Sequence, residues 1–217
     1  MFIHYIYINS SNINETTNDS IESIKEIHNK HYTFSNATIK YHTYVDIIKL
    51  LNEYDKELCF LFKQINTNYA ALLADIGRYI VLYKYGGVYH DLKCMSDYNI
   101  ESIYENIKDT LIGEICPNEP HRVRNTNIIV KSTKHPFIDI VLHEIKNKLI
   151  KGKITNIYGS RNMFLIGSHT YISLFEIYSK KMNIIEKRLD NFITINKDIY
   201  HKKKLKKWQN TEEYIFK

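Results

Sequence analysis

The stretch YIVLYKYGGVYHDLKC, residues Tyr79–Cys94, carries the strongest structural signal in the chain. A helical pattern runs into two adjacent glycines, Gly86 and Gly87, and a short β-prone run follows them. Gly86 is the expected end of the helix, because glycine adopts a positive φ without a Cβ penalty. The run GVYHDL is then predicted to be a strand, with Asp91 near its carboxyl end. Ligands bind at that edge of open α/β sheets, so Asp91 is either a helix cap or a ligand contact.

The helix before the glycines carries two opposite charges, Asp75 and Arg78, three residues apart. On spacing alone they form a surface ion pair worth less than ~1 kcal/mol. Gly77 lies between them, and a glycine in the middle of a helix costs about 1 kcal/mol relative to alanine. We therefore expect something to approach the helix closely at Gly77. The second glycine of the pair, Gly87, would likewise allow backbone to approach a ligand.

Strand and helix candidates alternate over the first part of the chain. The apolar start FIHYIYI predicts a buried strand, SIESIKEIHNK a helix, ATIKYH a second strand and YVDIIKLLNEY a second helix. This order is typical of a doubly wound α/β sheet. Later strand candidates are DTLIGEI, NIIVK and NFITIN, and later helix candidates are HPFIDIVLHEIKNKLI and RNMFLIGSHTYISLFEIYSKK, the second interrupted at Gly167-Ser168. We expect one domain, residues 1–217, around a central, mostly parallel sheet.

Composition indicates a globular chain and does not favour nucleic-acid binding. Hydrophobic residues make up 44% of the 217 residues and charged residues 25%. The net charge of +6 fits an anionic ligand but is too small and too scattered to indicate nucleic acid. The three cysteines, Cys59, Cys94 and Cys116, include no CxxC pair, which argues against a disulfide framework or a zinc cluster. With no basic region and cleavage site at the start and no run near ~18 apolar residues, we expect no signal peptide, no transmembrane segment and a cytoplasmic location.

The segment ALLADIGRYIVLYKYGGVYHDLKC resembles the signature of the glycosyltransferases that contain a DxD motif. These are family 32, the mannosyltransferase-like enzymes, and the related catalytic domains of large glucosylating toxins. The positions in register with the family pattern are Asp75, Arg78, Leu82, Gly86, Gly87, Val88, Tyr89 and Asp91. Weaker similarity extends to FIHYIYIN near the start and to NTNIIVKSTKHPFIDIVLHEI after the motif, and FLIGSHTYISLF occupies the place of a Thr-Gly-Pro motif.

This resemblance implies a GT-A-type, Rossmann-like α/β fold and a nucleotide-sugar-dependent enzyme. Such an enzyme moves a sugar from a UDP- or GDP-linked donor to a carbohydrate or other hydroxyl acceptor, with retention of configuration. The family pattern assigns donor-sugar binding to Asp75, Arg78, Gly86, Gly87 and Tyr89. A carboxylate accepts hydrogen bonds from sugar hydroxyls and a guanidinium donates to them, which fits the first two residues.

Asp91 corresponds to the first carboxylate of the DxD motif, and the resemblance makes it both a catalytic residue and a ligand of Mn²⁺ or Mg²⁺. Such a cation neutralises the diphosphate as the glycosidic bond breaks. Lys93 stands where the second carboxylate belongs, and a lysine ammonium has no lone pair for a metal. Three outcomes stay open: Asp91 keeps the metal with other ligands, Lys93 binds the phosphates and replaces the metal, or the site is inactive.

A non-catalytic relative, kept as a carbohydrate-binding or interaction module, is the alternative function. The loss of the second motif carboxylate at Lys93 favours it, whereas the retention of Asp75, Arg78 and Asp91 disfavours it. The basic segment HKKKLKKW, residues His201–Trp208, is either a solvated terminal segment, a part that closes over the nucleotide, or a surface for nucleic acid or anionic membrane.

Overall fold

The structure, a computed structural model, describes residues 1–9, 19–33, 35–97, 99–107, 111–116, 119–157, 159–182, 184–187, 193–196, 199 and 213–216. The basic segment 201–208 lies outside these residues, as does the first part of the predicted strand 191–196.

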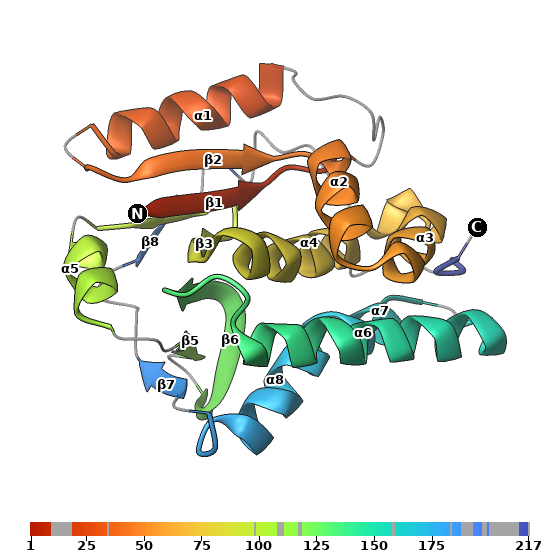
Figure 1. Ribbon diagram of the computed structural model, residues 1–217. Helices are drawn as coiled ribbons and strands as arrows, with labels where there is room; N and C mark the ends of the chain where they lie inside the picture. The colour runs from red at the N-terminus through yellow and green to blue at the C-terminus, as the bar shows by residue number, and fades with distance from the viewer. Residues whose placement is uncertain are drawn as a thin grey trace.

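Within the described residues, six strands form the central sheet in the order β2-β1-β3-β6-β5-β7 (Figure 1). They are β1 (Phe2–Ile6), β2 (Thr38–His42), β3 (Gly87–His90), β5 (Leu111–Cys116), β6 (Glu119–Val130) and β7 (Ile184–Lys187). β1 is parallel to β2 and β3, β5 is parallel to β7, and β6 is antiparallel to both β3 and β5. Five strands therefore run in one direction, which confirms the mostly parallel sheet. Two further strands, β4 (Cys94–Ser96) and β8 (Ile193–Ile195), pair antiparallel beside it.

Helices cover both faces of this sheet because its strands alternate apolar side chains between two cores. One core joins Ile3, Tyr5, Val88, Ile112 and Ile129 to α1 (Asp19–His31) and α5 (Asn99–Asn106). The larger core takes the alternate strand residues and packs them against the remaining helices. These are α2 (Tyr44–Tyr54), α3 (Lys56–Gln64), α4 (Ala70–Tyr85), α6 (Pro136–Thr155), α7 (Gly159–Ile166) and α8 (Ser168–Tyr178), with a short 3-10 turn, η1 (Thr67–Tyr69), before α4.

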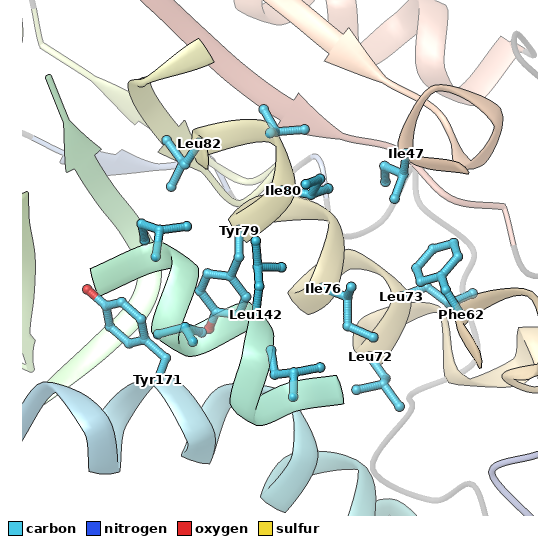
Figure 2. Close-up of a cluster of buried hydrophobic side chains, with 14 of the residues drawn as sticks. Ile47, Phe62, Leu72, Leu73, Ile76, Tyr79, Ile80, Leu82, Leu142 and Tyr171 are labelled. Atoms are coloured by element: carbon cyan, nitrogen blue, oxygen red, sulfur yellow. The ribbon is translucent and has the colours of Figure 1, made fainter. Parts of the chain in front are cut away.

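Helix α4 lies at the centre of the larger core, with its apolar stripe buried against α2, α6 and α8 (Figure 2). A Cβ at Gly77 would come within 2.5 Å of Ile47 Cδ1 and 3.0 Å of Ile6 Cδ1. The close approach expected at Gly77 is thus made by side chains of the chain's own core, from α2 and β1.

The two adjacent glycines form the turn from α4 into β3, as the sequence predicted. Gly86 has a φ of 62° and donates its N–H to Leu82 O at 2.8 Å, which ends the helix. A Cβ on Gly86 would lie 2.9 Å from Lys131 O, and one on Gly87 would lie 2.7 Å from Phe2 O. Both glycines are therefore required by the close approach of neighbouring backbone as well as by the turn.

Among the described residues five histidines are buried, and four of them lie in the sheet or against it: His4, His28, His42 and His90. His4 Nε2 lies 3.0 Å from Gly86 O, which can only accept, so this nitrogen carries the proton. His4 Nδ1 then accepts from His42 Nε2 at 2.9 Å. Burial lowers the pKa of His4 to about 3, helped by the neighbouring His42, and burial lowers the pKa of His28, His42 and His90 to about 4. These side chains are neutral parts of the folded interior.

The buried histidines predict a steep loss of stability in mild acid. Their pKa values are lowered by folding, so the unfolded chain binds more protons below about pH 6.5 and stability falls as the pH falls. Each histidine removes about 1.4 kcal/mol from the free energy of unfolding between pH 7.5 and 5.5, and the four together about 5 kcal/mol. Urea unfolding at both pH values measures this difference.

His28→Gln should reduce the loss by about a quarter, since one of the four groups is gone. The matched control is His143→Gln, which removes an exposed histidine and should leave the loss as in the wild type. Equal stability of the wild type at pH 7.5 and 5.5 would contradict the neutral, buried assignment.

Candidate functional site

Asp91 lies at the carboxyl end of β3, at the edge of the sheet where the parallel strands end, as predicted. Its N–H donates to Thr126 O at 3.0 Å, and its side chain is 27% exposed. The strand stops at His90, however, because residues 91–94 form a turn closed by the bond from Cys94 N–H to Asp91 O at 2.7 Å. The prediction that the strand continues through Leu92 is therefore wrong.

Asp75 and Arg78 form a buried ion pair. The prediction of a surface ion pair, made from the spacing alone, is therefore wrong. Arg78 Nη2 lies 2.6 Å from Asp75 Oδ1, and both side chains are less than 10% exposed. The same Nη2 lies 3.4 Å from Asp91 Oδ1, so the three charged groups meet at one place. Tyr89 completes this contact: its hydroxyl donates to Asp91 Oδ1 at 3.0 Å, and its ring lies 4.7 Å from the Arg78 guanidinium carbon.

The Asp75 carboxylate is held by donors on both oxygens. Asn125 Nδ2 donates to Oδ1 at 3.1 Å, and the Ser168 hydroxyl donates to Oδ2 at 2.9 Å. Ser168 begins α8, directly after Gly167 at the break from α7, and a Cβ on Gly167 would collide with the Asp75 carboxylate. The interruption of the helix at these two residues therefore lets the chain close over Asp75.

The neighbours of Arg78 stabilise its positive charge. Burial would lower the pKa of Arg78, but Tyr89, Asp75 and Asp91 outweigh it, so that pKa is raised above its ordinary value. The pKa of Asp75 is raised above its ordinary value by burial and by the neighbouring Asp91, while Arg78 and the hydrogen bonds from Ser168 and Asn125 act in the opposite direction.

Arg78 has a second anchor, since its Nη1 donates to Asn125 O. Its Nε is buried and has no hydrogen-bond partner among the residues that the structure describes. A buried donor without a partner costs free energy, so the guanidinium is not placed for stability alone.

The residues around Asp91 do not form a complete site for Mn²⁺ or Mg²⁺ by themselves. Mg²⁺ is commonly held by one or two carboxylates together with substrate phosphates and water, and here Asp91 offers one carboxylate whose Oδ1 already faces Arg78 and Tyr89. Across the described parts of the chain, no three His, Cys, Asp or Glu residues gather as a possible metal site. Lys93, two residues on in the turn, adds positive charge and no ligand.

Two of the predicted donor-binding residues lie apart from this cluster. Gly86 and Gly87 are at the beginning of β3, and Asp91 follows the other end, about 13 Å away at ~3.3 Å per residue. The structure therefore brings together Asp75, Arg78, Tyr89 and Asp91, and Gly86 and Gly87 lie at the amino end of β3, away from them.

Sequence reasoning did not assign Asn125 or Ser168 to the site. Asn125 belongs to the polar run Arg124-Asn125-Thr126-Asn127, which stands in a strand that ends with three apolar residues. A polar run of this kind inside a central strand is the signal that could have found it.

Part of the chain is similar to a known protein family. Residues 10–110 match the family described as the glycosyltransferase sugar-binding region containing a DXD motif, which is 101 of the 217 residues. No curated protein sequence matches the chain.

Solved structures show the fold. The PaToxG glycosyltransferase superposes with a TM-score of 0.51 at 16% identity, over 83% of this chain and 68% of that one. The ligand-free glycosyltransferase domain from the YGT toxin superposes with a TM-score of 0.50 at 11% identity, over 80% of this chain and 56% of that domain. The fold is of the GT-A type. The predicted fold class is thereby confirmed, and no described helix has the length and apolar character needed to cross a membrane.

The buried ion pair makes a prediction about stability. Arg78→Ala leaves the Asp75 carboxylate buried without its cation and should lower the free energy of unfolding by about 3–5 kcal/mol. Urea unfolding at pH 7.5 measures the loss.

The matched control is Lys84→Ala on the same helix, which removes the exposed partner of Glu53 and should leave the unfolding midpoint close to that of the wild type. If both variants lose the same stability, the Asp75–Arg78 pair is not a buried one.

Proposed function

We propose that the chain, as one catalytic domain over residues 1–217, transfers a sugar from a UDP- or GDP-linked donor to an acceptor hydroxyl with retention of configuration. The observation that carries the proposal is the meeting of Asp75, Arg78 and Asp91 at the carboxyl edge of a GT-A-type sheet. These are the charged positions that stand in register with the family's donor-binding pattern. The match of residues 10–110 to a sugar-binding region supports the same activity.

Asp91 and Arg78 are the proposed contacts for the donor sugar. Asp91 is the most exposed of the three charged groups, and Arg78 beside it has an Nε–H from which no described residue accepts a hydrogen bond. A guanidinium donates to sugar hydroxyls and a carboxylate accepts from them. Asp75 is engaged on both oxygens, so a sugar hydroxyl reaches it only by replacing Ser168 or Asn125. The proposed role of Asp75 is to hold Arg78 in place, and to accept from a sugar hydroxyl when that hydroxyl replaces Ser168 or Asn125.

Lys93 is the proposed phosphate-binding residue. In the reaction the bond from the anomeric carbon to the diphosphate breaks, and its electron pair stays on the diphosphate. The acceptor oxygen bonds to the anomeric carbon on the same face, and the acceptor proton passes to a diphosphate oxygen. A fixed positive charge beside the leaving group stabilises this transition state. Lys93 provides that charge in the turn after Asp91, where family members carry a second carboxylate.

Asp91→Asn should lower the rate of nucleoside-diphosphate release from UDP- and GDP-sugars about 100-fold or more, since it removes the negative charge that faces the sugar. Release is measured on the purified chain, with water and with a panel of glycan acceptors. Glu53→Gln, the same chemical change on the exposed face of α2, is the control and should keep the wild-type rate. Equal release from Asp91→Asn and the wild type would refute the assignment. Binding of a nucleotide sugar without any release by the wild type would instead favour the non-catalytic module.

Lys93 has its own test. Lys93→Ala should lower the rate of release about 10-fold or more, and EDTA should leave the wild-type rate unchanged, because the lysine replaces the metal charge. Lys93→Asp restores the family motif and should make release depend on Mn²⁺ or Mg²⁺. Lys84→Ala serves as the lysine control. A wild type that EDTA inhibits, together with a harmless Lys93→Ala, would rule out this role and return the metal to Asp91.

A further inference from the structure

Strand β6 contains a bulge beside the charged cluster. Gly113 of β5 pairs with Ile128, but the next residue, Glu114, pairs with Arg124. One step along β5 thus corresponds to four residues of β6, so residues 125–127 of β6 have no pairing partner in β5. On its other side β6 keeps the regular pairing of His90 with Asn127. Bulges re-aim side chains and are common beside active sites.

Each of the three charged residues is bound to this bulge. Asn125 O accepts from Arg78 Nη1, and Asn125 Nδ2 donates to Asp75 Oδ1 at 3.1 Å. Thr126 O accepts from the Asp91 N–H at 3.0 Å. The bond from Asp91 to Thr126 O continues the regular register of β3 with β6, whereas Asn125 O faces the side of β5. The bulge frees this carbonyl from the ladder with β5, so the place of Arg78 depends on the bulge.

The bulge is in turn held by one buried carboxylate, Glu114, which is 4% exposed. Its Oε2 accepts from Thr126 Oγ1 at 2.8 Å and from Asn127 Nδ2 at 2.7 Å. Asn127 Oδ1 then accepts from His90 Nδ1 at 2.7 Å, which links the bulge to β3. A buried carboxylate is costly unless it is hydrogen-bonded, and here both bonds go to bulge side chains. Glu114 therefore ties the side chains of Thr126 and Asn127, and with them the bulge, to β5.

We propose that Glu114 is a positioning residue: by fixing the bulge at residues 125–127 it sets the places of Arg78 and Asp91. Its effect on turnover rests on the proposed function, whereas its effect on the bulge does not. A displacement of about 1 Å in a reacting site can cost 100-fold in rate, so a loosened bulge should be visible in kinetics.

The test compares Glu114→Ala with Glu114→Gln. The glutamine keeps an oxygen that can accept from Thr126 and Asn127, and the alanine has none. Two readouts are taken: amide hydrogen exchange of Asp91, whose N–H bonds to the bulge, and kcat/KM for nucleoside-diphosphate release from the donor that the wild type uses. Asp55→Ala, which removes the cap of α3 and a partner of Lys146, is the control for general loss of stability.

Glu114→Ala should speed exchange at Asp91 about 10-fold or more and lower kcat/KM about 10–100-fold, with Glu114→Gln close to the wild type in both. Asp55→Ala should change neither. Unchanged exchange at Asp91 in Glu114→Ala overturns the proposal, and so does faster exchange with unchanged kcat/KM. The same losses in Asp55→Ala overturn it too, because the effect would then be one of stability. A wild type that releases no nucleotide overturns the proposed function instead, and the exchange data then decide whether Glu114 holds the bulge.

Discussion

A buried ion pair between Asp75 and Arg78 is the constraint on which the arrangement of the site depends. Two opposite charges are tolerated inside α4 because each has further partners: Asn125 and Ser168 for the carboxylate, Asp91 and Asn125 for the guanidinium. Those partners come from the turn after β3, from β6 and from the start of α8, so the pair joins one end of the sheet to α4 and α8. A hydrophobic pair of similar volume would often serve stability equally well. The charges are therefore better explained by a ligand than by the needs of the core.

The rest of the fold brings this pair to a place where a ligand can meet it. The turn at Gly86 and Gly87 lets β3 follow α4 directly. Arg78 of the helix therefore lies beside Asp91, which follows the strand. β3 then ends at His90, and the tight turn after it carries Asp91 and Lys93 out of the sheet. On the other side of β3, the bulge of β6 receives both Arg78 and Asp91. The short strand β3 thus separates the tightly packed glycines, Gly86 and Gly87, from the charged residue Asp91.

Much of the fold could be predicted from the sequence, because its signals are local. The helix that ends at Gly86, the strand that follows it and the alternation of strands and helices depend on neighbouring residues. The site was predicted only as far as the motif reaches: Asp75, Arg78, Tyr89 and Asp91 do meet. The motif could not predict that Asp75 and Arg78 are buried, because their burial depends on packing between segments far apart in the sequence. Asn125 and Ser168 lie 50 and 93 residues from Asp75, and the bulge depends on a pairing register that no local pattern determines. The strand after the glycines was predicted two residues too long, because a four-residue turn begins at Asp91.

The central claim is that Arg78 and Asp91 face the sugar of a nucleotide donor, and a crystal structure of the chain with a bound UDP- or GDP-sugar tests it most directly. We expect sugar hydroxyls within hydrogen-bond distance of Arg78 and Asp91 at the carboxyl end of β3, with the diphosphate next to Lys93. A donor that binds elsewhere and contacts none of Asp75, Arg78 and Asp91 would show that these residues do not bind the sugar.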